Sequence, residues 1–492
     1  MRRRDFLKVT GLGGMARAQT AARRPNVIVI FADDLGYGDL ACYGSKTNRT
    51  PSLDRMAAEG ARFTDAYVPM PFCAPSRSAL LTGRYPFRTT VTRNPAPDGG
   101  INDVALPQSE VTIAEALKPL GYATMAIGKW HLGHLPGWLP RTQGFDEYYG
   151  ILYSNDMRPV QLVHNERVAQ YPVPQSELTR DYTERALQYI DRNRGGPFFL
   201  YLPHAMPHKP LAASEDFYTP ETPADLYADV IRELDWSVGK VLAKVRELGL
   251  DRDTLVVFTS DNGPWFGGDT GGLRGMKGSS WEGGIRVPMI ARWPGRIPAG
   301  LVSREMCGVI DLFPTICRLA GAALPDDRTI DGRDIFELMT KPGAKTPHEA
   351  LFAMTGPRLQ SIRSGRWKLH VPAPAPGFAY MEDASQWVDP RGPDGVTIIA
   401  QYEQARPNQY PGMRTGDAPA PMMLFDLDKD PAEQRNVAGN NPEIVAKLKR
   451  MFERMEGEVP KRSAPRPPGG ARKLLRLKGG ELRYDREPAA PR

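Results

Sequence analysis

A cysteine lies four residues before an arginine in the stretch Cys73-Ala74-Pro75-Ser76-Arg77, and Thr82-Gly83-Arg84 follows it with a second arginine. The Pro-Ser pair is typical of a turn, so we expect a loop to enter a helix here. Cationic side chains and a helix N-terminus both favour a bound anion, and both lower the pKa of a thiol. A buried cysteine beside a salt-bridged arginine is the structural alternative. The stretch therefore predicts a thiol held beside two cations.

Four oxygen-bearing side chains follow two predicted strands. Asp33 and Asp34 end the first strand, and Asp261 and Asn262 end the second. A set of oxygen ligands without histidine or cysteine suits a hard cation such as calcium or magnesium, and does not suit zinc. Taken alone, an Asp-Asp pair is also typical of a solvated turn or a helix cap, and Asp-Asn-Gly of an ordinary turn.

Lysine and histidine residues supply further candidates for chemistry. Lys129 and His131 are two residues apart, so on an extended segment they point to the same side. His208 follows a third predicted strand, and His204, four residues earlier, is its rival. Read alone, Lys277 and Lys129 are ordinary surface charges and His131 is a half-buried histidine. The residue types by themselves therefore do not decide between a functional and a structural role.

The elements that must position these side chains are strands alternating with helices. Each of three short apolar runs, rich in β-branched or aromatic residues, ends in polar side chains, as buried parallel strands do at the site-bearing edge of an open α/β sheet. The alternation predicts a doubly wound α/β domain over residues 24–340. The predicted strands are 26–31, 198–202 and 254–259, and the predicted helices are 52–60 with Ser52 as its N-cap, 111–117 and 226–248.

The pattern changes after residue 345. Short strand-like pieces precede a final helix, which predicts a small antiparallel sheet with one covering helix in an α+β subdomain over residues 345–458. Residues 372–421 are rich in Pro, Gly and Asp and are predicted to be a long surface insertion. Residues 459–492 are predicted to be a basic, flexible tail. The predicted elements of the subdomain are 350–354, 359–363, 367–371 and 424–427, followed by the helix 442–457.

Charge and cysteine content argue against a nucleic-acid-binding protein and against a disulfide-rich protein. The chain of 492 residues has a formal net charge of +7, but residues 460–492 hold ten Lys or Arg and three Asp or Glu, which accounts for the whole excess. The rest is close to neutral, so no nucleic-acid partner is expected. Four cysteines do not form a disulfide framework in a chain of this length. We expect Cys307 and Cys317 to be buried thiols, with a disulfide between them as the alternative.

The N-terminus carries an export pattern. Arg2-Arg3-Arg4-Asp5-Phe6-Leu7-Lys8 matches a twin-arginine signal, and Ala16-Arg17-Ala18 offers a cleavage site, so residues 1–18 are predicted to direct export to the periplasm or the outside of a bacterial cell. A disordered basic N-terminus is the alternative. No run of about 18 apolar residues follows, and we therefore expect no transmembrane segment.

The string C-x-P-S-R-x4-T-G-R that begins at Cys73 resembles the activation motif of the type I sulfatases, which belong to the alkaline phosphatase superfamily. The resemblance implies an alkaline phosphatase-like fold, a large mixed sheet flanked by helices, and a Cys73 oxidised to formylglycine by a formylglycine-generating enzyme. It also implies a Ca²⁺ site, with Mg²⁺ as the alternative, held by Asp33, Asp34, residue 73, Asp261 and Asn262. Other matching landmarks are Gly128–Gly133, Thr50–Arg55, Asp311–Thr315 and Leu424–Leu427, and the likeness runs from about Pro25 to Gly457.

The same resemblance implies a role for each site residue. Lys129 and Lys277 would bind sulfate and Arg77 would stabilise its oxygens. His208, helped by Lys277, would protonate the departing alcohol, and His131 would be the base that releases sulfate. Ser154, in Tyr153-Ser154-Asn155-Asp156, resembles a substrate contact of arylsulfatase A-like members.

The predicted function is hydrolysis of sulfate esters, either of small molecules or of sulfated carbohydrates. A phosphonate or phosphate monoester hydrolase on the same fold is one alternative, because the site would also hold a tetrahedral phosphorus. A non-catalytic binding protein with an unmodified Cys73 is the alternative from another class.

Overall fold

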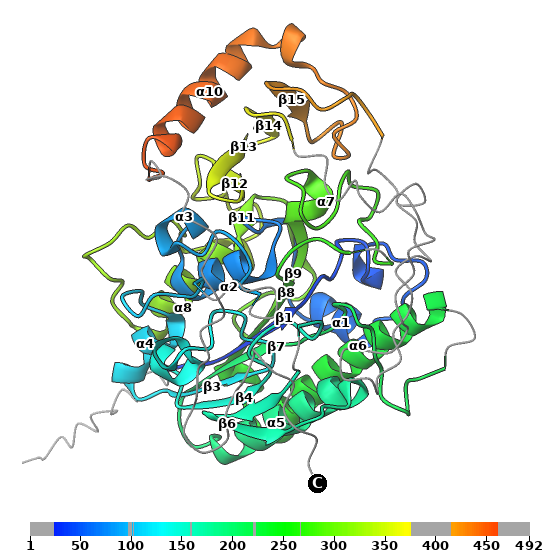
Figure 1. The fold of residues 1–492 in the computed structure, drawn as a ribbon, viewed down its shortest axis with the longest axis vertical. Helices are drawn as coiled ribbons and strands as arrows, with labels where there is room; N and C mark the ends of the chain where they lie inside the picture. Colours follow the sequence, from blue (N-terminus) through cyan, green and yellow to red (C-terminus); the bar gives the residue numbers. More distant parts are fainter. Residues whose placement is uncertain are drawn as a thin grey trace, which may run out of the picture.

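The computed structural model describes residues 24–96, 101, 103–157, 160–219, 223–265, 267–374 and 415–460. The predicted export segment 1–18, most of the predicted insertion 372–421 and nearly all of the predicted tail 459–492 lie outside these residues. Figure 1 shows a large α/β body, with a smaller sheet and one helix at one end of the molecule.

The centre of the body is a parallel arrangement of the three predicted strands. β1 (Asn26–Ala32) pairs in parallel with β7 (Phe198–Pro203) on one side and with β8 (Thr254–Ser260) on the other. The register aligns Phe31 with both Pro203 and Thr259. The carboxyl ends of all three strands therefore lie at one edge of the sheet, as predicted.

The whole sheet is mixed and has 11 strands among the described residues. Its middle strands are parallel, whereas β9 runs antiparallel to both β8 and β2, and β5 runs antiparallel to β4 and β6. The predicted large mixed sheet is confirmed. Its other strands are β2 (Ala61–Tyr67), β3 (Ala123–Ile127), β4 (Glu147–Gly150), β5 (Leu162–His164), β6 (Arg167–Gln170), β9 (Arg286–Arg292), β10 (Leu301–Ser303) and β11 (Cys307–Gly308), in the order β10-β2-β9-β8-β1-β7-β3-β4-β5-β6 with β11 beside β2.

Helices cover both faces of this sheet, which explains why β1 is apolar along its whole length (Figure 1). Val27, Val29 and Phe31 pack into the core on one face, and Ile28 and Ile30 pack into the core on the other. On the first face lie α2 (Cys73–Thr82), α4 (Ile113–Leu117) and α8 (Leu312–Ala320), and on the second lie α1 (Pro51–Ala58), α5 (Leu178–Arg192) and α6 (Pro223–Glu247). Shorter helices are α3 (Pro86–Thr89), α7 (Glu282–Ile285) and α9 (Phe336–Thr340).

The start of α1 differs from the prediction. The helix follows Thr50 and begins at Pro51, so Ser52 is not its N-cap. The fixed φ of proline suits the first helical position, where its missing N–H is not needed. The Ser52 N–H instead donates to Asp235 on α6, at 3.0 Å.

The C-terminal elements form the predicted small antiparallel sheet with one helix. β12 (Leu351–Thr355), β13 (Arg358–Ser364), β14 (Trp367–His370) and β15 (Met423–Asp426) pair in chain order, and α10 (Pro442–Glu456) packs on them. We call these five elements and the loops between them the small-sheet unit. Most of its buried apolar side chains belong to the same core as α2 and α8, and Met423, Phe425 and Leu427 cluster with Trp281 of the body, so the unit and the body are packed as one structure.

The four cysteines are free thiols, and Cys307 and Cys317 are buried as predicted. In the described part of the chain, no helix combines the length and the apolar character that crossing a bilayer requires.

Candidate active site

The polar residues that follow β1 and β8 meet at the carboxyl edge of the sheet. Asp261 accepts a hydrogen bond on Oδ1 from the backbone N–H of Asp34, at 3.1 Å, and the Asn262 amide donates to Asp34 Oδ1 at 2.7 Å. Asp34 has a φ of 64°, which turns the chain sharply so that Asp33 and Asp34 both remain at this edge. The predicted convergence of these four residues is present.

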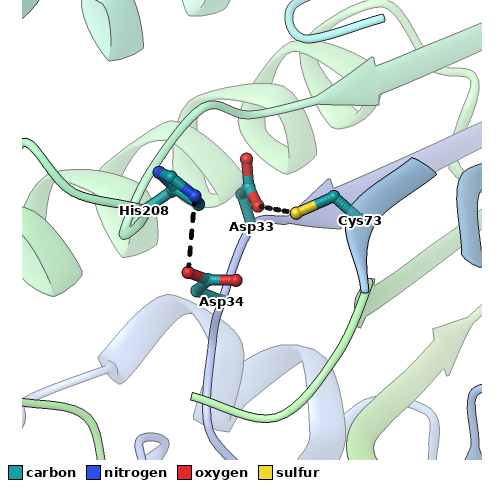
Figure 2. Close-up of side chains that lie close together, drawn as sticks. All are labelled: Asp33, Asp34, Cys73 and His208. Carbon is teal, nitrogen blue, oxygen red and sulfur yellow. Dashed lines mark hydrogen bonds and ion pairs between the residues drawn. The ribbon is translucent and has the colours of Figure 1, made fainter. Parts of the chain in front are cut away.

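Cys73 joins this group from the first turn of α2. Its Sγ lies 3.4 Å from Asp33 Oδ1, and Figure 2 shows it pointing at that carboxylate, with His208 facing Asp34. One potential ligand atom from each of these four side chains lies within 4.8 Å of the other three. All four side chains are buried. The helix start and the site location predicted for Cys73 are both observed.

The expected activation of the thiol is wrong. Burial raises the pKa of Cys73 well above its ordinary value, and the nearby Asp261 and Asp33 raise it further, against the weaker effect of Lys129 and Lys277. Arg84 does not contribute a charge here, because it lies beyond the other end of α2 and pairs with Glu110 at 2.7 Å. An unmodified Cys73 is therefore a protonated, unreactive thiol at neutral pH.

Arg77 lies on α2, one turn after Cys73, and binds protein groups with all three guanidinium nitrogens. Nε and Nη2 donate to Asp261 Oδ2 at 3.2 and 2.7 Å, and Nη1 donates to the Lys129 carbonyl at 2.8 Å. Nη2 also lies 3.5 Å from Asp33 Oδ2. Because Arg77 is fully buried and pairs with both Asp261 and Asp33, it orients these carboxylates.

Two lysines pair with the carboxylates that follow β1. Lys129 Nζ lies 2.5 Å from Asp33 Oδ2 and donates to Ser154 Oγ at 3.0 Å, whereas Lys277 Nζ lies 2.7 Å from Asp34 Oδ1. Burial acts to lower the pKa of both lysines, but Asp33 and Asp34 outweigh it and raise both pKa values. Both lysines are therefore cations at neutral pH.

A glycine allows Lys129 to reach this position. Gly128 has a φ of 127°, and a Cβ at this residue would lie 1.8 Å from the Pro203 carbonyl at the end of β7. Only a residue without a side chain fits between β3 and β7 here. The glycine of the Gly128–Gly133 motif thus places the following lysine at the site.

His208, and not His204, stands beside the carboxylates. Its Nε2 is 3.7 Å from Asp34 Oδ2, and its Nδ1 lies 3.0 Å from Asn155 Oδ1. Ser154 Oγ lies 3.3 Å from the same ring. His204 instead contacts Ser237 on α6, at 3.3 Å. Asn155 therefore orients His208. The sequence analysis did not predict this role, although Asn155 follows Ser154 in the stretch Tyr153-Ser154-Asn155-Asp156.

His131 is buried near the same group. Its Nε2 lies 3.1 Å from the Pro95 carbonyl, and its Nδ1 has no hydrogen-bond partner among the described residues. Burial lowers its pKa well below the ordinary value, and Lys129 and Arg77 lower it further. The ring is therefore neutral at neutral pH.

The donor atoms at this edge fit a hard cation. Asn262 Oδ1 is buried and has no hydrogen-bond partner in the described part of the chain, which is an orphaned oxygen next to two carboxylates. Asp33, Asp34 and Asn262 thus offer the oxygen ligands that calcium and magnesium prefer. Both carboxylate oxygens of Asp261 accept hydrogen bonds, from Arg77 and from the Asp34 N–H, as those of Asp34 do from Asn262 and Lys277, and His208 also approaches the cluster.

Comparison with known proteins agrees with this site. The family model described as Sulfatase matches residues 25–322. Arylsulfatase A of Homo sapiens is 37% identical, over 89% of this chain and 89% of that protein. Steryl-sulfatase of Mus musculus is 35% identical, over 85% of this chain and 79% of that protein. The crystal structure of Ps i-CgsB in complex with k-i-k-neocarrahexaose is 29% identical, with a TM-score of 0.72 over 89% of this chain and 94% of that one.

These matches span the β1, Cys73, Lys129, His208 and β8 segments that build the site. The alkaline phosphatase-like fold and the function predicted from the sequence are both confirmed. The chain belongs to the sulfatase family and is a sulfuric ester hydrolase.

Proposed function

We propose that this sulfatase uses residue 73 as a formylglycine and a divalent cation held by Asp33, Asp34 and Asn262. The observation that carries the proposal is the position of Cys73 Sγ, 3.4 Å from Asp33 in a cluster where both of these side chains are fully buried. As a thiol this residue is unreactive, because its pKa is raised by burial. A hydrated aldehyde at the same position would supply one hydroxyl that attacks sulfur and a second that expels sulfate and restores the aldehyde.

The chain's own residues would stabilise the charge on the sulfate group. A cation bound to the carboxylates would lower the pKa of a hydroxyl on residue 73 and neutralise sulfate oxygens. Lys129, paired with Asp33, and Lys277, paired with Asp34, are fixed cations that would donate N–H bonds to the same sulfate oxygens. Asp261, whose pKa is raised by burial and by Asp33, is suited to accept the proton of the attacking hydroxyl.

Proton transfers to and from the substrate would fall to the two histidines. His208 lies 3.7 Å from Asp34 and within 3.3 Å of Ser154, so it faces the site and can protonate the departing alcohol. His131 is neutral and has a free Nδ1, so it can take the proton whose loss releases sulfate from residue 73. Ser154, which binds both Lys129 and His208, would align the two donors.

The substrate class that we favour is a sulfated carbohydrate. The relative Ps i-CgsB binds k-i-k-neocarrahexaose, and its likeness covers 89% of this chain. An aryl sulfate remains a suitable probe, because the chemistry acts on the sulfate ester bond. Rates on matched sulfated sugars, with and without their sulfate groups at single positions, would identify the ester that is cleaved.

Two measurements test the nucleophile and the reaction. Mass spectrometry of the peptide that holds residue 73 should show the loss of sulfur, and turnover of an aryl sulfate should scale with the converted fraction. A fully active protein with an intact thiol would refute the formylglycine. Faster turnover of an aryl phosphate than of the aryl sulfate would favour the phosphate or phosphonate ester alternative.

We also propose that residues 1–18 direct export after residue 73 has been converted in the cytoplasm. Replacing Arg3 and Arg4, the arginine pair that precedes Asp5-Phe6-Leu7-Lys8, by lysine should retain the active protein in the cytoplasmic fraction. An unchanged distribution would refute the twin-arginine route.

A further inference from the structure

A cluster of charged side chains is buried where the small-sheet unit meets the body, away from the carboxylates of the active site. Lys368 Nζ lies 3.0 Å from Glu282 Oε1 and 3.1 Å from Glu433 Oε1, and His370 Nε2 lies 2.7 Å from that same Glu433 oxygen. None of the four side chains is more than 1% exposed. Apolar residues of similar volume often replace buried ion pairs without loss of stability, so stability alone does not account for this cluster.

The cluster binds the backbone of residues 274–284, which we call the Lys277 segment. Glu433 Oε2 accepts the Glu282 N–H at 2.6 Å, and Lys368 Nζ donates to the Ser280 carbonyl at 2.9 Å. At the other end of the segment, Arg274 donates to the backbone carbonyl of Glu433 at 2.9 Å and to that of Asp417 at 2.8 Å. Residues of the small-sheet unit therefore hold the segment three residues before Lys277 and three and five residues after it.

Between these points the segment reaches the active site. The backbone N–H of Lys277 donates to the Pro264 carbonyl at 3.0 Å, and that of Gly278 donates to the Pro71 carbonyl, two residues before Cys73, at 3.0 Å. Lys277 Nζ then lies 2.7 Å from Asp34 Oδ1. A lysine side chain is flexible, so the place of its ammonium group depends on the place of its backbone. A displacement of about 1 Å is enough to lower a rate strongly.

We propose that Glu433 is a positioning residue for Lys277, and that the small-sheet unit thereby sets the geometry of the active site. Glu433 is central because its carboxylate binds Glu282, Lys368 and His370 while its carbonyl binds Arg274. Glu433 contacts neither the active-site carboxylates nor residue 73, so it acts only through the Lys277 segment. The inference rests on the role that the proposed function gives to Lys277.

The test is a double-mutant cycle on the full chain with Glu433→Gln and Lys277→Ala. In the wild-type background, Glu433→Gln should lower kcat/KM for an aryl sulfate by about tenfold or more, since the amide cannot satisfy all three partners of the carboxylate. In the Lys277→Ala background the same change should alter kcat/KM less than about twofold. Each rate is divided by the converted fraction of residue 73, measured by mass spectrometry.

Asp426→Asn is the matched control variant. Asp426 lies on β15 in the same unit, is 7% exposed and pairs with Arg366, but does not contact the Lys277 segment. It should change kcat/KM less than about twofold even if it lowers the melting temperature as much as Glu433→Gln does. An equal loss of activity in Asp426→Asn would overturn the proposal, because it would reflect weakening of the whole unit.

An effect of Glu433→Gln that is equally large with and without Lys277 would also overturn the proposal. If Glu433→Gln does not fold, Arg274→Lys replaces it in the cycle, because lysine keeps the charge but does not bridge the carbonyls of Glu433 and Asp417 as the guanidinium does. Full activity of Lys277→Ala alone is a separate result. It would refute the proposed role of Lys277, and the inference with it.

Discussion

A buried glutamate on α6 should make the stability of this protein depend on pH. Glu233 is 1% exposed, and its Oε2 accepts the Ser214 N–H at 2.9 Å, which fixes the loop that follows His208. Its other oxygen has no hydrogen-bond partner among the described residues. Burial raises the pKa of Glu233 to about 7 from an ordinary value of 4.5, and the bonds to Ser214 offset only part of that effect.

The sign of the effect follows from proton binding. The unfolded chain loses this proton near pH 4.5, whereas the folded protein keeps it to about pH 7. Within that window the folded state binds more protons, so the free energy of unfolding falls as the pH rises. Each pH unit changes it by about 1.4 kcal/mol, so the contribution of Glu233 falls by about 3 kcal/mol across the window and is then lost.

Glu233→Gln isolates this contribution, because the amide resembles the protonated acid and does not ionise. Urea unfolding should show that the variant becomes more stable relative to the wild type as the pH rises. The free energy of unfolding of the variant minus that of the wild type should increase by about 3 kcal/mol between pH 4.5 and pH 8. Glu247→Gln, at an exposed glutamate on the same helix, is the control for the loss of a carboxylate outside the core. A difference for Glu233→Gln that stays constant within about 0.5 kcal/mol would refute the reasoning.

Three further outcomes are expected at the active site. Arg77→Met leaves Asp261 and Asp33 buried without their cation, so it should lower the free energy of unfolding by about 3–5 kcal/mol in urea unfolding. Adding Asp261→Asn should recover part of the lost free energy. A decrease below about 1 kcal/mol for Arg77→Met would contradict the buried pairs. Lys277→Ala should lower kcat/KM for an aryl sulfate by about 10²–10³ with an unchanged circular dichroism spectrum, and a loss below about threefold would exclude a direct role. Removal of divalent cations with a chelator should lower both activity and melting temperature, and added Ca²⁺ or Mg²⁺ should restore both; full activity after exhaustive chelation would exclude the cation.

The central strands and the convergence of the site were predictable from the sequence because both depend on local patterns. An uninterrupted apolar run such as 26–31 is stable only when it is covered on both faces, and parallel strands bring their carboxyl ends to one edge. The polar residues after β1 and β8 therefore had to meet. The glycine, lysine and histidine motif at 128–133 and the helix start at Cys73 were also local signals.

Other features depend on contacts that the sequence does not display. The motif contains two arginines, but only the fold shows that Arg77 binds the site carboxylates while Arg84 pairs with Glu110 at the far end of α2. The pKa of Cys73 depends on burial and on Asp261, 188 positions away along the chain, so local cations gave the wrong direction. The Glu282–Glu433 contact joins residues 151 positions apart, and no periodic pattern marks either of them.

Long-range contacts join the small-sheet unit to the two segments that carry Cys73 and Lys277. β12 binds the loop before Cys73, where the Met354 N–H donates to the Pro69 carbonyl at 2.8 Å. β12 also binds Tyr85, because the Phe352 N–H donates to the Tyr85 hydroxyl oxygen at 3.0 Å. The unit therefore contacts the approach to residue 73 from one side and the Lys277 segment from the other. Since these two segments carry the proposed nucleophile and a proposed sulfate-binding cation, we expect a weakened contact with the unit to change the distance between them.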